Sequence, residues 1–108
     1  MIKVGIIGIG RIFDKHFNSL NKNKNYKIIA VCDKDLKKSN KDNIRGIKFY
    51  KNYETMIKMH IFDLIVICTP SGQHAKQAIY ISKFVKNIVI EKPISISLKE
   101  ALKLEKIE

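Results

Sequence analysis

Apolar residues gather in five short runs that alternate with segments of helical spacing. The runs are rich in isoleucine and valine and have the length of buried parallel strands. They cover residues 2–7, 26–32, 47–50, 62–68 and 85–90. Because strands that alternate with helices form parallel sheets, this pattern predicts a single α/β domain.

Apolar residues three and four positions apart predict helices between most of these strands. Helices are expected at residues 12–20, at 53–59 with Asn52 as the cap, at 73–84, and after Ser95 or Ser97. The charged connection at residues 35–48 predicts only a short surface helix and a loop. Right-handed crossovers then favour the strand order 3-2-1-4-5, a Rossmann-like, doubly wound parallel sheet.

The chain has 108 residues, enough for one domain with a core of its own. No apolar run approaches the roughly 20 residues that cross a bilayer, and the chain starts with a strand pattern rather than a signal peptide. We therefore expect a cytoplasmic protein. Cys32 and Cys68 end apolar runs, which predicts buried, reduced thiols. The sequence has no C-x-x-C motif and no cluster of cysteine and histidine, so we do not expect a zinc site.

The formal net charge of +11 raises nucleic acid as an alternative ligand. All but two of the 21 basic residues are lysines, and the exceptions are Arg11 and Arg45. Nucleic-acid readers concentrate arginine and aromatic residues, so this spread of lysines favours a solvated surface over nucleic-acid binding. A basic surface would still attract anionic ligands such as dinucleotides.

The turn between the first strand and the first helix contains Gly8 and Gly10. In dinucleotide-binding folds, the first such glycine takes a conformation closed to other residues, and the second lets the main chain approach a pyrophosphate. The amides at the start of the helix can then face the phosphates. Phe13 departs from the G-x-G-x-x-[G/A] pattern, which predicts a wider helix–sheet spacing or a shifted turn.

Asp33 ends the second strand, 23 residues after Gly10. This offset is close to that of the acidic residue that binds the adenosine ribose hydroxyls in such folds. The alternative is an aspartate that only caps the next helix. A carboxylate here would repel a 2′-phosphate and so favours NAD over NADP, although Lys34 beside it keeps NADP as an alternative.

Four polar or glycine-containing segments follow strands and should therefore meet at one edge of the sheet. They are residues 8–10, Asp33, residues 68–72 and residues 91–93. Ligands of open parallel sheets bind beyond the carboxyl ends of the strands, near the switch in strand order. The sequence therefore predicts a ligand site at this edge.

These segments, taken together, resemble the N-terminal domain of the Gfo/Idh/MocA family of NAD(P)-dependent sugar oxidoreductases. The motifs that carry the resemblance are Gly8-Ile9-Gly10-Arg11-Ile12, Val31-Cys32-Asp33, Cys68-Thr69-Pro70-Ser71-Gly72-Gln73-His74 and Glu91-Lys92-Pro93. The resemblance covers essentially the whole chain. Within the family, the sequence is most similar to bacterial nucleotide-sugar 3-dehydrogenases that act on UDP-N-acetylglucosaminuronate in the synthesis of surface polysaccharides, including lipopolysaccharide.

The resemblance implies a cofactor site whose parts come from all of these motifs. The residues implied to hold the pyrophosphate are Gly8, Gly10, Arg11 and Ile12, and Asp33 would take the adenosine ribose. Those implied to line the dinucleotide cleft are Thr69, Pro70, Ser71 and His74. Glu91 would lie near the nicotinamide ribose. For His74, a purely structural role in the first turn of its helix is the alternative.

The resemblance also implies a catalytic residue, Lys92, that contacts the reacting sugar hydroxyl and helps to move its proton as hydride passes to the nicotinamide. A partly desolvated lysine beside a cationic ring has its charged form disfavoured, so it could exchange protons near neutral pH. The alternative is that Lys92 is one more surface lysine.

Enzymes of this family continue into a second α/β domain that binds the substrate and forms most of the oligomer interface. We therefore expect residues 1–108 to form a dinucleotide-binding domain that is truncated at its C-terminal end, lacks the substrate domain and cannot turn over a sugar alone. The alternative is a non-catalytic nucleotide-binding or interaction module, which pairs with itself or a partner through an exposed sheet edge.

Overall fold

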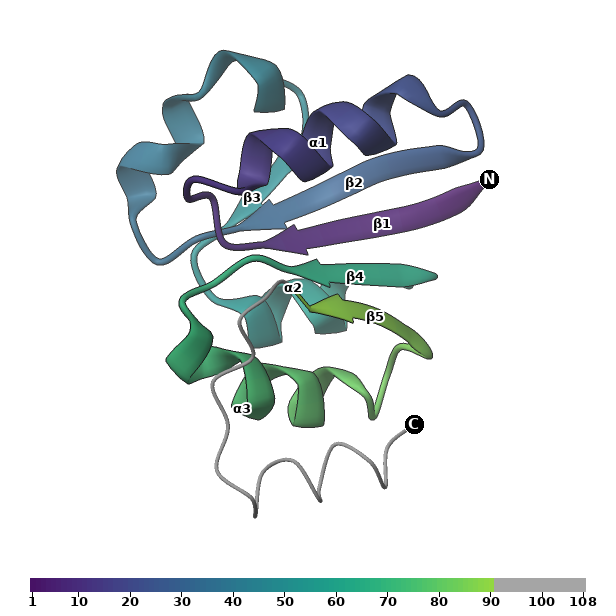
Figure 1. The fold of residues 1–108 in the computed structure, drawn as a ribbon, viewed down its shortest axis with the longest axis vertical. Helices are drawn as coiled ribbons and strands as arrows, with labels where there is room; N and C mark the ends of the chain where they lie inside the picture. The colour runs from purple at the N-terminus through teal and green to yellow at the C-terminus, as the bar shows by residue number, and fades with distance from the viewer. Residues whose placement is uncertain (91–108) are drawn as a thin grey trace.

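The computed structural model describes residues 1–90, which form a parallel sheet with helices on both faces (Figure 1). Within this range the strands are β1 (Ile2–Ile7), β2 (Tyr26–Cys32), β3 (Lys48–Tyr50), β4 (Leu64–Ile67) and β5 (Asn87–Ile90). Their order is β3-β2-β1-β4-β5, and every pairing is parallel. The predicted strand order is confirmed.

The helices are α1 (Phe13–Lys22), α2 (Tyr53–Met59) and α3 (Ser71–Ile81) in the described part of the chain. The charged connection after β2 forms two short 3₁₀ helices, η1 (Leu36–Asn40) and η2 (Asp42–Ile44). We term η1 and η2 together the 3₁₀ segment. Helix α1 and the 3₁₀ segment cover one face of the sheet, and α2 and α3 cover the other (Figure 1). None of these helices has the length and apolar character needed to span a bilayer.

The described core has one part on each face of the sheet. On the α1 face, Phe13 and Phe17 pack with their ring centroids 5.4 Å apart. They lie in one buried cluster with the side chains of β1 and β2 that point to this face. On the other face, Met56 of α2 and Ile81 of α3 are fully buried against the sheet. Because both faces are covered, strands with near-continuous apolar sequences are the expected result.

Phe13 lies in the core, although the glycine motif usually has a small residue at this position. It is the first residue of α1, and its side chain is 0 % exposed. The ring therefore forms part of the contact between helix and sheet.

Several predicted boundaries shift by one to three residues in the structure; β5, for example, begins at Asn87 rather than residue 85. Strand β4 begins at Leu64 rather than residue 62, although Phe62 is buried and the Asp63 amide donates to the Lys3 carbonyl of β1 at 2.9 Å. Helix α3 begins at Ser71, directly after Pro70, and ends at Ile81 rather than residue 84. The α2 prediction is confirmed, and the Asn52 side chain caps this helix by accepting from the Glu54 and Thr55 amides.

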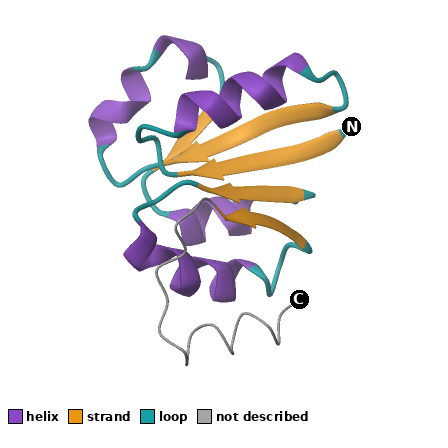
Figure 2. Cartoon of the chain, in the orientation of Figure 1, coloured by secondary structure: helices purple, strands orange, loops and turns teal. Residues whose placement is uncertain are grey.

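The carboxyl ends of the strands lie in one row. Register pairs join Tyr50 to Cys32, Cys32 to Ile7, Ile7 to Ile67, and Ile67 to Ile90. The arrowheads of all the strands point to the same side of the molecule, where the connecting loops gather (Figure 2). This edge, which we term the carboxyl rim, carries the candidate site.

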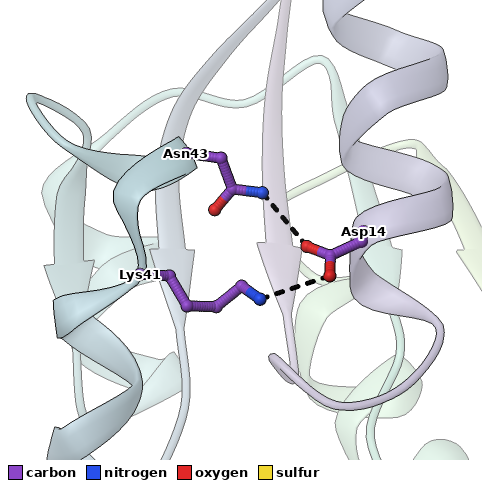
Figure 3. Close-up of polar contacts among 3 residues, drawn as sticks. All are labelled: Asp14, Lys41 and Asn43. Carbon is purple, nitrogen blue, oxygen red and sulfur yellow. Dashed lines mark hydrogen bonds and ion pairs between the residues drawn. The ribbon is translucent and has the colours of Figure 1, made fainter.

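The 3₁₀ segment is attached to the start of α1 by polar contacts (Figure 3). The Asp14 carboxylate forms an ion pair with the Lys41 ammonium at 3.2 Å and accepts from the Asn43 amide at 3.0 Å. Asp14 also lies in the first turn of α1, where a negative charge stabilises the helix dipole. These contacts hold the segment between β2 and β3 beside the glycine turn.

Candidate functional site

A cavity of about 780 Å³ opens at the carboxyl rim. Its described lining comes from the ends of β1, β2 and β4, from the 3₁₀ segment and from the starts of α2 and α3. The lining residues are Ile7, Gly8, Ile9, Gly10, Cys32, Asp33, Lys34, Lys38, Lys51, Asn52, Tyr53, Glu54, Cys68, Thr69, Pro70, Gln73, Lys76 and Gln77. A volume of this size is typical of small-molecule and cofactor sites.

The glycine turn forms one wall of the cavity. Gly8 has a φ of +96°, and a Cβ there would lie 2.7 Å from both the Cys68 carbonyl carbon and the Thr69 amide nitrogen. Its conformation and its contact with the β4–α3 loop therefore both require glycine. At Gly10 a Cβ would meet no described atom within 4 Å, so the protein leaves open space there. That space is what a phosphate would need to approach the main chain.

Asp33 connects the end of β2 to this turn. Its Oδ2 accepts from the Ile9 amide at 2.7 Å, and its Oδ1 accepts from the Asp35 amide at 2.8 Å. The η1 cap is Asp35, whose side chain accepts from the Lys37 amide. Since a carboxylate offers about four acceptor positions, Asp33 can still accept hydrogen bonds from a ligand in the cavity.

The wall opposite the 3₁₀ segment carries a chain of hydrogen bonds. The Thr69 hydroxyl donates to Gln77 Oε1 at 2.5 Å, and Gln77 Nε2 donates to Gln73 Oε1 at 3.3 Å. Behind this wall, His74 is 2 % exposed, and its Nε2 contacts the Thr69 carbonyl. His74 Nδ1 has no hydrogen-bond partner among the described residues. His74 therefore supports the β4–α3 loop from within the fold.

The charge of the cavity favours an anion. Among the described residues its lysines are Lys34, Lys38, Lys51 and Lys76, whereas its carboxylates are Asp33 and Glu54. Two other ionisable groups stay neutral at pH 7. Burial, with a smaller contribution from Asp33, raises the pKa of Cys32 to about 12, and burial followed by the Glu54 charge raises the pKa of Tyr53.

The structure brings together several of the site residues expected from sequence. Those that line the cavity are Gly8, Gly10, Asp33, Thr69 and Pro70. Arg11, Ile12 and His74 are not on the wall formed by the described residues. Ser71 begins α3. Glu91 and Lys92, with Pro93, lie outside the described residues.

Sequence reasoning missed several residues of the wall, namely Lys38, Lys51, Asn52, Tyr53, Glu54, Gln73, Lys76 and Gln77. A signal existed for the two glutamines. They are four positions apart on a predicted helix, so they share a face that begins just after the Thr69-Pro70 segment. For the lysines, no local pattern distinguishes those of the cavity from the many on the surface.

Comparison with known proteins agrees with this geometry. Residues 2–108 match the family model described as an oxidoreductase family with an NAD-binding Rossmann fold. Two curated relatives are the myo-inositol 2-dehydrogenase of Thermotoga maritima (27 % identical over 101 residues, 92 % of this chain) and the glucose-6-phosphate 3-dehydrogenase of Bacillus subtilis (30 % identical over 104 residues, 94 % of this chain). The chain spans 30 % and 29 % of their lengths, respectively.

Solved structures show the same fold. The WlbA dehydrogenase of Chromobacterium violaceum, solved in complex with NADH and UDP-GlcNAcA, superposes with a TM-score of 0.88 at 28 % identity. The myo-inositol 2-dehydrogenase of Lactobacillus plantarum superposes with a TM-score of 0.86 at 29 % identity. Each alignment covers 98 % of this chain and about a third of the larger protein, 31 % and 32 % respectively.

Proposed function

The chain belongs to the Gfo/Idh/MocA family of oxidoreductases, and we propose that the cavity at its carboxyl rim binds NAD. The observation that carries this proposal is the contact between Asp33 and the Ile9 amide, 2.7 Å long. It places a carboxylate with spare acceptor positions directly beside a glycine turn that has open space at Gly10. A ribose diol and a pyrophosphate, joined as in a dinucleotide, need these two features side by side.

Four groups of residues would hold the cofactor. Asp33 would accept hydrogen bonds from the adenosine ribose, and the turn from Gly8 to Ile12 would hold the pyrophosphate with its main-chain amides. The cavity lysines would add charge attraction to the phosphates. Thr69 and Pro70 would line the cleft. The Asp33 charge favours NAD over NADP, because it would repel a 2′-phosphate.

We extend the proposal to the reaction. Bound NAD supplies the hydride acceptor for oxidation of a hydroxyl group on a sugar or nucleotide sugar. Support comes from the relatives, whose names specify dehydrogenation of glucose 6-phosphate and inositol, and from WlbA, solved with a nucleotide sugar. Lys92 would contact the substrate hydroxyl and accept its proton, and Glu91 would lie near the nicotinamide ribose. Both follow Ile90, which pairs with Ile67 at the carboxyl rim.

We propose that the residues that bind the sugar substrate belong to a second domain, outside this cofactor domain. The chain covers about a third of each related structure, 31 % of WlbA for example. We propose that a second domain is required for sugar turnover, and that residues 1–108 bind the cofactor without it.

Titration of NADH fluorescence tests cofactor binding. Asp33→Ala should weaken NADH binding about tenfold or more, because hydrogen bonds to a charged acceptor each contribute ~1.5–3 kcal/mol. The matched control is Asp35→Ala, which removes a carboxylate two positions away that caps η1 and does not line the cavity. Failure of the chain to bind millimolar NADH would contradict the proposal, as would equal weakening by both variants.

A second assay tests whether sugar turnover requires a second domain. The chain is incubated with NAD and UDP-N-acetylglucosaminuronate, and NADH formation is followed. Binding of NADH without turnover by the 108-residue chain agrees with the requirement for a second domain. Turnover by this chain alone, lost in Lys92→Met but not in Lys86→Met, would support Lys92 and contradict that requirement.

A further inference from the structure

The hydrogen bonds between Thr69, Gln77 and Gln73 run in one direction along the cavity wall. Thr69 donates to the Gln77 carbonyl at 2.5 Å, and the Gln77 amide donates to the Gln73 carbonyl at 3.3 Å. Gln77 is only 4 % exposed, whereas Thr69 and Gln73 are half-buried. A buried amide needs hydrogen-bond partners, so Gln77 fixes the orientation of its two neighbours.

This direction decides what the wall presents to a ligand. The Thr69 proton points to Gln77, so the Thr69 oxygen keeps lone pairs that can only accept. The Gln73 carbonyl is occupied by Gln77, so the free N–H of the Gln73 amide can only donate. The loop under Thr69 is held by the contact between its carbonyl and His74. The cavity wall, which Thr69 and Gln73 both line, therefore presents a fixed acceptor and a fixed donor that Gln77 joins.

We propose that Gln77 is a positioning residue that sets this acceptor–donor pair to select the adenine base of the dinucleotide. Adenine carries an amino group next to a ring nitrogen, so it donates to Thr69 and accepts from Gln73. Hypoxanthine and guanine carry a carbonyl beside an N–H and present the reverse pattern. This inference rests on the proposed cofactor function and adds the residue that determines base specificity.

The carboxamide of the nicotinamide ring also has an amino group beside an acceptor atom. It could therefore make the same two hydrogen bonds as adenine. Adenine is favoured because the pair shares its cavity with Asp33, to which the proposal assigns the adenosine ribose, and with the start of α2, which packs on β2 and β3. The proposal places the nicotinamide ribose near Glu91 instead, after β5 at the opposite end of the sheet. Lys34 and Lys38, which follow Asp33 in the chain, also line this cavity. The two sources can be separated by titration with AMP and with nicotinamide mononucleotide.

The test compares NADH with the reduced form of nicotinamide hypoxanthine dinucleotide, which differs only at the base and has the same fluorescent ring. The wild-type chain should bind NADH about tenfold more tightly, since a matched pair of hydrogen bonds to a base discriminates by about that factor or more. Gln77→Met removes the hydrogen bonds that orient Thr69 and Gln73, so it should reduce the preference for NADH to about twofold or less.

Gln77→Glu gives a result that a structural role alone would not. A carboxylate at this position can only accept, so Gln73 must turn its N–H towards it and its carbonyl towards the cavity. The Thr69 oxygen still accepts, so the wall then presents two acceptors and each base matches only one of them; the tenfold preference should fall to about equal binding of the two dinucleotides. Asn18→Asp, at an exposed position on α1, adds the same charge outside the cavity and should keep the wild-type preference. Thermal unfolding confirms that each variant is folded.

Four results would overturn the inference. Equal binding of the two dinucleotides by wild type would show that the pair does not read the base, and a wild-type preference for hypoxanthine would show the reverse hydrogen-bond direction. An effect of Gln77→Met on nicotinamide mononucleotide but not on AMP would assign the pair to the carboxamide instead. Absence of any NADH binding would overturn the proposed function itself, and this inference with it.

Discussion

The carboxylate of Asp33 accepts a hydrogen bond from the backbone amide of Ile9 at 2.7 Å, although the two residues are 24 positions apart. The contact ties the end of β2 to the glycine turn that follows β1. The residue proposed to bind the ribose therefore also fixes the position of the turn proposed to bind the pyrophosphate.

Asp33→Asn should change the choice of cofactor. The substitution removes the negative charge that would repel a 2′-phosphate, while Lys34 and Lys38 remain on the cavity wall. We expect the affinity for NADPH relative to NADH to rise about tenfold, as measured by fluorescence titration with each. The free energy of unfolding should fall by about 1 kcal/mol. The asparagine side-chain oxygen can accept from one of the two backbone amides that Asp33 binds, but the side-chain NH₂ cannot accept from the other. Asp35→Asn is the control, and an unchanged preference would contradict the prediction.

Alanine at the two glycines of the turn should separate folding from binding. Gly8→Ala should destabilise the protein by about 3 kcal/mol, because the residue has φ +96° and its new methyl group would lie 2.7 Å from the Cys68 and Thr69 backbone. Gly10→Ala should leave stability within about 1 kcal/mol, since its methyl group meets no described atom within 4 Å, but should weaken NADH binding. Urea unfolding and NADH titration measure the two effects. Similar loss of stability in both variants would be inconsistent with this geometry.

Phe13→Ala should be strongly destabilising, although it restores the small residue that the dinucleotide motif usually has. The Phe13 ring is completely buried between α1 and the sheet, and its loss would cost about 3–5 kcal/mol in the free energy of unfolding. Phe84→Ala, at a side chain that is 53 % exposed, is the control and should cost far less. A small effect at Phe13 would mean that the turn repacks around the smaller residue.

Cys32 should make the protein less stable at high pH. Burial, followed by the charge of Asp33, raises its pKa from 9.0 to about 12 in the folded state. Above pH 9 the unfolded thiol loses its proton while the folded one keeps it, so the stabilisation present below pH 9 is lost as pH rises towards 12. At about pH 10.5 the loss should be about 2 kcal/mol.

The control for this pH effect is Cys32→Ala, which keeps every lysine and tyrosine that also titrates in that range. Urea unfolding of both proteins at neutral and high pH gives the difference. Parallel declines in stability would contradict a raised pKa for Cys32.

The sequence alone predicted the parts of the molecule that depend on local physics. Runs of β-branched residues and helical spacing predicted the strands and helices, because both patterns reflect burial within a few neighbouring residues. The preference for right-handed crossovers between them then predicted the strand order that the structure has. Asn52 was identified as a helix cap and Gly8 as the special turn residue for the same reason, since capping and positive φ are properties of the local backbone. The carboxyl rim followed from the direction of parallel strands.

The sequence left open what depends on contacts between distant segments. It allowed two interpretations for His74, and packing of α3 on the sheet buries this side chain behind the loop rather than on the cavity wall. It suggested a helix cap as an alternative for Asp33, whereas the η1 cap is Asp35. The 35–48 segment had no clear pattern, because it is held by contacts such as that between Lys41 and Asp14, which are 27 positions apart.

Sequence by itself thus determined the layers, the strand order and the edge where a ligand would bind. Only the tertiary structure decided that Gln77 is buried and joins Thr69 to Gln73, and that Asp33 meets Ile9. The physical reason is that periodicity and backbone preference act over a few residues and are visible in the sequence. The direction of a hydrogen bond in a cavity depends on which side chains the completed packing brings together.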